Sequence, residues 1–172
     1  PHAHRGKIIH FEEGPAPGGG PQQPSILRKP EVIHGLRNLI QNAVDFAQTR
    51  VWVEAAWSET SIQLRIIDDG PGYPQHLLSR IGEPYLRDRR GEKRPEYEGM
   101  GLGLFIAKTL LERTGATVRF ANCNGRHVPR GFSGKRCGAM AEVTWPRAAI
   151  EGNPRSALGE NPNFERSNGE RA

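Results

Sequence analysis

The sequence predicts an α/β sandwich, in which helices pack on one face of a mixed, mostly antiparallel β-sheet. Two observations lead to this fold class. Segments with strand and helix periodicity follow one another in the order strands, helix, two strands, helix, two strands. The chain has 172 residues, which fits one domain of ordinary size, and its apolar residues concentrate in these periodic segments.

The N-terminal segment is expected to form short strands and a loop of the same domain. Residues 7–11 predict a short strand, and residues 12–24 are rich in glycine and proline, which is typical of a turn or flexible loop. Residues 25–28 are a candidate second strand that would pair with the first.

A long helix is predicted for residues 30–48. Pro30 suits a first helical turn because its missing N–H would have no partner there. Apolar residues recur at helical spacing, which predicts a stripe that faces the core. They are Val32, Leu36, Leu39, Ile40, Ala43, Val44 and Ala47.

Two alternating segments, residues 50–57 and 61–67, follow with three polar residues between them, which predicts a β-hairpin. Residues 76–81 predict a short helix. The polar, basic residues 82–99 have no period, which indicates a long mobile lid.

The last elements are a helix at residues 101–113 and strands at 117–121 and 139–145, with a basic loop at 122–138 between the strands. The chain that follows Pro146 is polar and poor in apolar residues, so it is expected to be a flexible tail. The chain is thus divided into an N-terminal segment (1–29), a main folded unit (30–146) and a tail (147–172).

The formal net charge of +5 is compatible with nucleic acid, a membrane surface or a phosphate-rich ligand as partner. The basic residues gather in the two expected loops, 82–99 and 122–138. Neither loop has the interleaved aromatic residues of a platform that stacks single-stranded bases.

The two cysteines, Cys123 and Cys137, and the lack of a signal peptide predict a reducing cytoplasm and ordinary thiols. Their spacing with His127 fits no common zinc pattern. No apolar run is long enough to span a bilayer.

Three polar residues, His34, Asn38 and Asn42, are four apart and share one face of the long helix, away from its apolar stripe. Asparagine is a weak helix former, so two stacked amides indicate a polar target. An amide oxygen is a hard, neutral ligand that suits Mg²⁺. Solvent exposure or local capping is the alternative.

A second motif, Asp68-Asp69-Gly70-Pro71-Gly72, directly follows an apolar strand. Gly70 and Gly72 permit a positive φ and a close backbone approach. Asp68, at the end of the strand, can accept a hydrogen bond from an exocyclic amine such as that of adenine. The alternative is a simple Asp-Gly turn.

A third motif places three alternating glycines, Gly99, Gly101 and Gly103, at the start of a helix. Glycines expose backbone N–H groups and a helix N-terminus favours anions, so the motif predicts a phosphate cradle. It lacks the Gly-Lys-Ser/Thr of a Walker loop and the preceding strand of a dinucleotide fingerprint. A flexible entry to the helix is the alternative.

The order of these motifs resembles the ATPase superfamily shared by histidine kinases, DNA gyrase, the ninety-kilodalton heat-shock chaperones and the MutL mismatch-repair proteins. The resemblance covers about residues 30–146. Residues 34–43 resemble the N box of histidine kinases, and residues 83–85 resemble a degenerate Phe-x-Pro-Phe box that lacks its leading aromatic. Residues 90–108 are similar to the redox-responsive global regulator kinases (Reg/Prr type) of photosynthetic and related proteobacteria.

The resemblance implies ATP and Mg²⁺ as cofactors. Asn42 would hold Mg²⁺ with Asn38 beside it, Asp68 would read the adenine amino group, and glycines would shape the base and phosphate sites. The Lys-Tyr that many kinases carry after the second asparagine is Asp45-Phe46 here, so a cationic phosphate contact would come from the lid or from Arg37. The residues implied in ATP binding are His34, Asn38, Asn42, Asp68, Gly70, Gly72, Arg90, Lys93, Arg94, Gly99, Gly101, Leu102, Gly103 and Leu104.

Asn38 favours a kinase over a hydrolase. Hydrolysing members of the superfamily carry at this position a glutamate that acts as general base on water, and an amide cannot accept that proton. Hydrolysis should then be slow, so the γ-phosphoryl group would await another nucleophile. Catalysis by Asn38 and Asn42 would consist of positioning and charge neutralisation.

The resemblance therefore implies the ATP-binding catalytic domain of a two-component sensor histidine kinase, which positions ATP·Mg²⁺ for γ-phosphoryl transfer to a histidine on a separate dimerisation domain and then to a response regulator. The His-Glu-x-x-Thr/Arg-x-Pro pattern of a phosphoacceptor is missing, so this chain alone is expected to be a monomer that does not phosphorylate itself. The parent would be a homodimeric inner-membrane protein with this domain in the cytoplasm.

Three alternatives stay open. One is a serine kinase of the anti-sigma type, although such kinases usually carry Glu near Asn38. Another is a nucleotide-binding signalling module without catalysis. The third is a nucleic-acid binder, whose affinity would depend steeply on salt; the kinase hypothesis expects no direct contact with nucleic acid.

Overall fold

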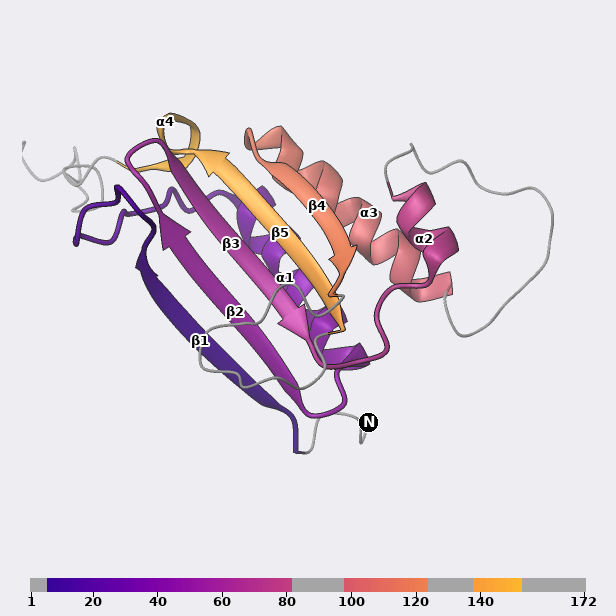
Figure 1. Cartoon of the computed structure of the whole chain (residues 1–172). Helices are drawn as coiled ribbons and strands as arrows, with labels where there is room; N and C mark the ends of the chain where they lie inside the picture. The colour runs from indigo at the N-terminus through magenta and orange to yellow at the C-terminus, as the bar shows by residue number, and fades with distance from the viewer. Residues whose placement is uncertain (1–5, 82–97, 124–137, 153–172) are drawn as a thin grey trace, which may run out of the picture.

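Five strands form one sheet, with two long helices packed against one of its faces (Figure 1). The computed structural model describes residues 6–81, 98–123 and 138–152. The strand order is β1-β2-β3-β5-β4; β1 runs parallel to β2, and every other neighbouring pair is antiparallel. The predicted α/β sandwich with a mixed, mostly antiparallel sheet is thus confirmed. The strands are β1 (Ile8–Pro15), β2 (Arg50–Trp57), β3 (Ser61–Asp68), β4 (Thr117–Asn122) and β5 (Ala139–Pro146).

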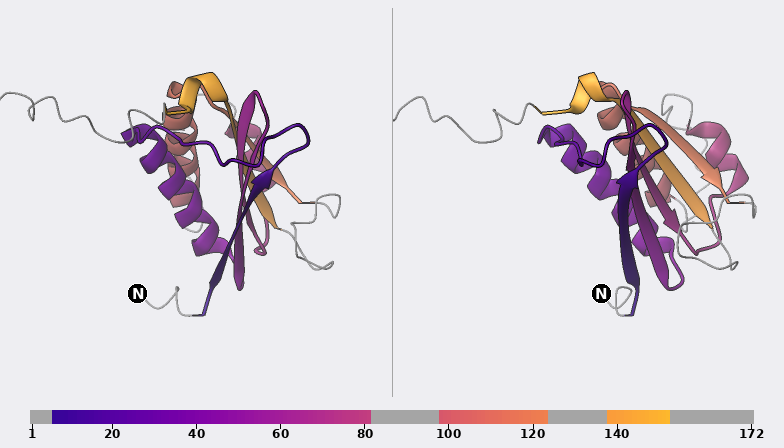
Figure 2. Two further views of the ribbon diagram at one scale, coloured as in Figure 1. Left: turned by 90° about the vertical axis from the view of Figure 1, so that its left-hand side faces the viewer. Right: turned by 60° about the vertical axis from the view of Figure 1, so that its left-hand side comes forward.

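The helices are α1 (Pro30–Phe46), α2 (Gln75–Arg80), α3 (Glu98–Arg113) and α4 (Arg147–Ile150). The two side views of Figure 2 show α1 and α3 in a layer of their own beside the sheet. The apolar core lies between the layers, and its largest fully buried side chains include Leu39, Leu111 and Trp145. Burying one such side chain stabilises a fold by about 1.5–3 kcal/mol.

Helices α1 and α3 approach each other closely at Gly35. A Cβ atom at this position would lie only 2.5 Å from Cγ of Leu111 on α3. Because Gly35 has no side chain, the two helix backbones come together, and the polar face of α1 keeps a fixed orientation relative to α3.

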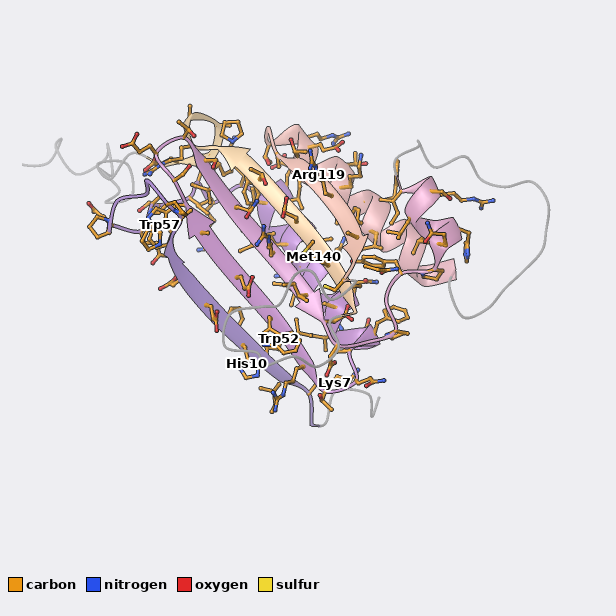
Figure 3. The ribbon with its side chains drawn as sticks, viewed as in Figure 1. Lys7, His10, Trp52, Trp57, Arg119 and Met140 are labelled. Atoms are coloured by element: carbon orange, nitrogen blue, oxygen red, sulfur yellow. The ribbon has the colours of Figure 1, made fainter. Side chains whose placement is uncertain are left out.

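The face of the sheet opposite the helices carries side chains in cross-strand rows. His10 stacks on Trp52 with ring centroids 6.0 Å apart, and the same row continues to Met140 (Figure 3). In the next row Arg65 forms an ion pair with Glu142 at 2.9 Å. This face is therefore distinct from the apolar core between the sheet and the helices.

The N-terminal segment differs from the prediction. Strand β1 continues to Pro15, through residues expected to be a loop, and pairs with β2 rather than with residues 25–28. Proline is tolerated there because β1 is an edge strand. The following turn is fastened to Trp57, whose Nε1 donates a hydrogen bond to Gly20 O at 2.8 Å and whose O accepts one from Ala16 N at 2.8 Å.

The predicted strand at residues 25–28 is wrong. This segment forms only an isolated bridge between Ile26 and Glu151, together with hydrogen bonds to the end of α4. The physical reason is that β2 already occupies the inner edge of β1 along the whole length of that strand.

Helix α4 lies in the segment that was expected to be a flexible tail. Ile150 is fully buried in the core, and Arg147 forms an ion pair with Glu151. The folded part therefore extends beyond Pro146, and residues 153–172 lie outside the described residues.

The strands of the hairpin and of the C-terminal pair match the predicted ranges to within a residue at nearly every end. Helix α1 ends at Phe46, and α3 begins at Glu98, three residues before the predicted start. Residues 82–97 of the predicted lid (82–99), with the degenerate Phe-x-Pro-Phe box, lie outside the described residues, and its last two residues belong to α3. The described residues contain no helix that is both long enough and apolar enough to cross a membrane.

The expectation of ordinary thiols is wrong for Cys123, which is disulfide-bonded. Its backbone N–H donates a hydrogen bond to Gly138 O at 2.8 Å, because the pairing of β4 with β5 brings the two ends of the 124–137 segment together. Cys137 and His127 lie outside the described residues.

Candidate functional site

Helix α1 presents the three polar residues of the first motif on a face away from the core. His34 is exposed, while Asn38 and Asn42 are partly buried. The core side of the same helix is formed by Val32 and Ala43, among others. Within the part of the chain that the structure describes, neither asparagine amide forms a hydrogen bond, so both remain available to a ligand.

The second motif is attached directly to the end of α1. Gly70 packs so close to this helix that a Cβ atom there would lie 2.1 Å from Phe46 O. Asn42 precedes Phe46 by one helical turn, which is about 6 Å along the axis. The structure thus brings the first two motifs together, although Asn42 and Asp68 are 26 positions apart in the chain.

Asp69 fastens this junction. Its Oδ1 accepts hydrogen bonds from the backbone N–H groups of Gln48, Thr49 and Arg50 at 2.8, 3.0 and 3.1 Å, and its Oδ2 accepts one from the Thr49 hydroxyl at 2.6 Å. Partial burial acts to raise the pKa of Asp69, but these hydrogen bonds outweigh it and hold the pKa below its ordinary value. Asp69 is therefore a structural carboxylate that joins the end of β3 to the turn between α1 and β2.

Asp68 is buried at the end of β3, with only 3% of its surface exposed. Its Oδ1 accepts hydrogen bonds from Gly70 N at 2.8 Å and Ala139 N at 3.4 Å. No described residue donates a hydrogen bond to its Oδ2. This oxygen is not among the fully buried side-chain atoms that lack a partner, so an incoming group can reach it. This oxygen is suited to accept a hydrogen bond from an amine.

Burial raises the pKa of Asp68 to about 6. The hydrogen bonds from Gly70 and Ala139 act in the opposite direction, and the neighbouring charge of Asp69 raises the pKa further. At neutral pH the carboxylate is ionised in most molecules, which makes it a strong hydrogen-bond acceptor.

The two glycines of the second motif have different tasks. Gly72 has a φ of +86°, a conformation that favours glycine, whereas Gly70 has no positive φ and is required by its contact with Phe46. The sequence predicted a positive φ and a close backbone approach for both glycines, whereas only Gly72 has the positive φ.

Two further residues, which no sequence motif indicates, contact Asp68 and the loop that follows it. Gly138 N donates to Asp68 O at 2.7 Å, and a Cβ atom at Gly138 would lie 2.2 Å from Gly70 O and 2.9 Å from Asp68 Oδ1. The side chain of Asn122 binds the backbone of Tyr73 through two hydrogen bonds. Gly138 precedes a strand and Asn122 ends one, and no local motif distinguishes them; only the pairing of β4 with β5 brings them beside Asp68 and the loop that follows it.

The glycines of the third motif lie within α3 rather than in front of it, because this helix begins at Glu98. A Cβ atom at Gly101 would touch Leu77 Cδ1 of α2 at 3.2 Å, whereas one at Gly103 would meet no atom within 4 Å. The surface of α3 is thus open at Gly103, in the second turn of the helix.

Leu102 and Leu104 were both implied in ATP binding, but their side chains differ in exposure to solvent. Leu104 is fully buried in the core, so its side chain cannot line a ligand site, while Leu102 is 44% exposed. The lid residues Arg90, Lys93 and Arg94 lie outside the described residues.

Arg37, considered as a phosphate contact, faces elsewhere. It lines a groove of about 590 Å³ between α1 and β1, together with Lys7 and Gln41. Lys7 Nζ donates a hydrogen bond to Val44 O at 2.6 Å near the end of α1. This groove contains none of the residues implied in ATP binding, so Arg37 is not suited to a phosphate contact.

The described residues offer no cluster of three or more His, Cys, Asp or Glu that could hold a metal ion. A cation at this site would instead rest on neutral amide oxygens and on the phosphates of a nucleotide. The uncommitted amides of Asn38 and Asn42 fit such a shared coordination of Mg²⁺.

Comparison with known proteins agrees with this geometry. Residues 28–148 match the family described as histidine kinase-, DNA gyrase B-, and HSP90-like ATPase. The chain is 53% identical over 165 residues to the sensor histidine kinase RegB of Cereibacter sphaeroides, which covers 94% of this chain and 36% of that relative. It is 30% identical over 105 residues to the sensor histidine kinase CpxA of Escherichia coli strain K12, which covers 61% of this chain and 21% of that relative. The chain thus spans about a third or less of the length of these relatives.

The fold is shared with solved histidine kinase structures. The mycobacterial sensor histidine kinase MprB has a TM-score of 0.52 and 23% identity over 80% of this chain and 81% of that chain. The catalytic domain of histidine kinase ThkA has a TM-score of 0.54 and 18% identity over 80% and 78%. Full-length ShkA, solved in complex with AMPPNP, has a TM-score of 0.55 and 20% identity over 88% and 27%.

Proposed function

Because the chain belongs to the family of histidine kinase-, DNA gyrase B- and HSP90-like ATPases and is the ATP-binding catalytic domain of a sensor histidine kinase, we propose that the residues described above bind the nucleotide. In this proposal Asp68 binds the adenine, α1 and the first turn of α3 face the phosphates, and Asn42 would hold Mg²⁺. The observation that carries this proposal is the buried Asp68 carboxylate, whose Oδ2 receives no hydrogen bond from the described residues and lies beside a loop that packs on the end of α1.

Asp68 distinguishes adenine from other bases through the exocyclic amine. Its Oδ1 is held by Gly70 N, so only Oδ2 is offered to the base. Because the carboxylate is buried, an amine that approaches it replaces few water molecules, and the hydrogen bond to the ionised acceptor is strong.

Asn42 and Asn38 position the phosphates. Bound Mg²⁺ supplies neutralisation of phosphate charge. Asn42 provides an amide oxygen for this ion, and Asn38 lies one turn earlier on the same face. Because an amide cannot act as a general base, Asn38 does not activate water, and the γ-phosphoryl group is preserved for transfer.

The remaining contacts come from α3 and from the lid. Gly99 and Gly101 belong to the first turn of α3, where unpaired N–H groups and the helix dipole favour an anion, and Gly103 in the next turn has no side chain to obstruct a phosphate. Arg90, Lys93 and Arg94 supply positive charge from the lid, and His34 lies at the outer end of the α1 face.

The whole protein, of which this chain is a part, transfers the γ-phosphoryl group to a histidine of its dimerisation domain and from there to a response regulator. The similarity to RegB, a sensor histidine kinase, supports this assignment. We propose that the parent is a homodimer at the inner membrane with this domain on the cytoplasmic side, and that this chain alone is a monomer that does not phosphorylate itself.

The test is a thermal unfolding experiment with ATP and Mg²⁺ on the wild type, on Asn42→Ala and on the control Gln41→Ala. Gln41 is an adjacent amide on the same helix, but its side chain bonds Asp45 at 2.8 Å and lines the other groove. A ligand at 100 times its Kd adds about 2.7 kcal/mol of stability. We expect this gain for the wild type and Gln41→Ala, and loss of the Mg²⁺-dependent part for Asn42→Ala.

If ATP leaves the melting temperature of the wild type unchanged at millimolar concentration, the proposed site is wrong. Catalysis is tested separately by adding the dimerisation domain of the parent. Labelled phosphate on that domain supports a kinase, whereas ATP binding without transfer identifies a nucleotide-binding module.

A further inference from the structure

The C-terminal end of β4 is joined to the loop after Asp68 by one side chain. Asn122 is the last residue of β4, and the loop that it contacts follows Asp68 by a few residues. Asn122 Oδ1 accepts a hydrogen bond from Tyr73 N at 2.6 Å, and Asn122 Nδ2 donates one to Tyr73 O at 2.8 Å. A single amide therefore satisfies both backbone groups of Tyr73, as a neighbouring strand would.

This contact also fixes the glycine that precedes Tyr73. Gly72 has a φ of +86°, and a Cβ atom there would lie 2.8 Å from Asn122 Oδ1. The amide of Asn122 thus occupies the space beside Gly72, and the loop cannot move toward β4 or away from it without breaking the pair of hydrogen bonds.

The side chain of Tyr73 is held by the same strand. It is buried and packs edge to face against Phe120 of β4, with ring centroids 5.8 Å apart and an interplanar angle of 87°. Burial raises the pKa of Tyr73, and the charge of the nearby Asp68 carboxylate raises it further, so the phenol stays protonated. Strand β4 thereby holds both the backbone and the ring of a residue next to Asp68.

We propose that Asn122 is a positioning residue for the base of ATP: it keeps residues 70–73 in the shape that completes the pocket around Asp68, without itself touching the reacting phosphates. The inference rests on the proposed function, because it assigns the base to Asp68. Nothing in the local sequence marks Asn122, since it is a single amide at the end of a strand.

Asn122 is exposed, so its removal opens no cavity in the core. In Asn122→Ala the loop loses both hydrogen bonds, and we expect the Kd for ATP to rise about tenfold. Asn122→Asp keeps an acceptor for Tyr73 N but loses the donor to Tyr73 O, and we expect an intermediate Kd.

The experiment compares the affinities for ATP and inosine triphosphate, whose base lacks the exocyclic amine, in the presence of Mg²⁺. In the wild type ATP should bind more tightly. In Asn122→Ala the preference for ATP should fall about tenfold, while the Kd for inosine triphosphate changes less than threefold. Gln63→Ala, which removes an amide of β3 that donates a hydrogen bond to the Thr144 hydroxyl at 3.5 Å, should keep the wild-type preference.

A second measurement follows the loop without any nucleotide. Amide hydrogen exchange at Tyr73 should become faster in Asn122→Ala, while exchange in β5 stays unchanged. If Asn122→Ala does not fold, the same two measurements on Asn122→Asp decide the matter.

The possible failures can be told apart. If the wild type binds ATP no more tightly than inosine triphosphate, the assignment of Asp68 fails and this inference fails with it. If the wild type prefers ATP and Asn122→Ala retains that preference, or weakens both ligands equally, then only the role of Asn122 is overturned.

Discussion

At Asp68, burial and hydrogen bonding act in opposite directions on one carboxylate. Burial raises its pKa to about 6, and the backbone N–H groups of Gly70 and Ala139 limit the rise. The free oxygen Oδ2 and the raised pKa have the same origin, since a carboxylate held away from water has few partners other than a ligand.

The raised pKa predicts that ATP binding weakens in acid. At pH 7 most Asp68 carboxyls are ionised, whereas at pH 5 about a tenth are, so the Kd for ATP should rise roughly tenfold over this interval. Calorimetric titration at a series of pH values measures it. In Asp68→Asn, which cannot ionise, the Kd should be higher at every pH and should not depend on pH in this way. If the Kd of that variant still rises in acid as it does in the wild type, the assignment is refuted.

The same group affects stability in a defined direction. The folded carboxyl titrates near 6 and the unfolded one near 3.8, so the folded state holds the proton more tightly. Asp68 therefore lowers the free energy of unfolding as pH rises from about 4 to about 6, and contributes no further change above that range. Asp69 acts with the opposite sign: its pKa is lowered, so its contribution is present above its ordinary pKa and is lost in acid.

At the scale of the elements, the packing of α1 on α3 determines where the asparagine face points. Gly35 permits this packing because no Cβ atom intervenes between the helix and Leu111. The polar face of α1 and the first turn of α3 come from distant parts of the sequence, and this contact holds the helices together.

We expect Gly35→Ala to lower the free energy of unfolding by about 1–3 kcal/mol, although alanine favours a helix more than glycine does. The added Cβ atom would lie 2.5 Å from Leu111 Cγ, so the helices must separate or Leu111 must leave its position. Urea denaturation measures the change. Gly103→Ala provides the matched control, because it places the same methyl group on α3 in open space and should stabilise the folded protein by up to about 1 kcal/mol.

A gain in stability for Gly35→Ala would show that the two helices do not approach each other as closely as the structure describes.

At the scale of the whole molecule, the folded unit includes the short helix α4. Ile150 is fully buried, and Ile150 O accepts a hydrogen bond from Leu27 N at 2.8 Å, which joins the chain after β5 to the segment before α1. The domain is thus closed by contacts between its two ends.

We expect Ile150→Ala to lower the free energy of unfolding by about 2–4 kcal/mol, because it leaves a cavity at a fully buried site. Leu27→Ala, at a position 37% exposed, should cost less than about 1 kcal/mol. Thermal and urea unfolding of both variants measure the difference. Equal, small effects would mean that α4 does not belong to the core.

Most elements could be predicted because each carries its own period. The stripe of α1 and the alternation of β2 and β3 arise from residues close together in the chain, and the structure confirms these elements within two residues. Strand β1 was predicted too short because its last residues, Glu12–Pro15 in the sequence, have no strand pattern and are extended only through pairing with β2. The tail was predicted too long because the three apolar residues of α4 are too few to show a period.

The sequence by itself determined the family, the three motifs and their order, because glycines, asparagines and a strand-ending aspartate are identified by residue type and by short spacings along the chain. Only the tertiary structure decided which groups meet: that Gly70 packs on the end of α1, that Gly138 and Asn122 frame the pocket, that Leu104 belongs to the core, and that β1 runs parallel to β2. The physical reason is that these contacts join residues tens of positions apart. Their partners are chosen by the packing of the sheet and helices, and no pattern of neighbouring residues encodes that choice.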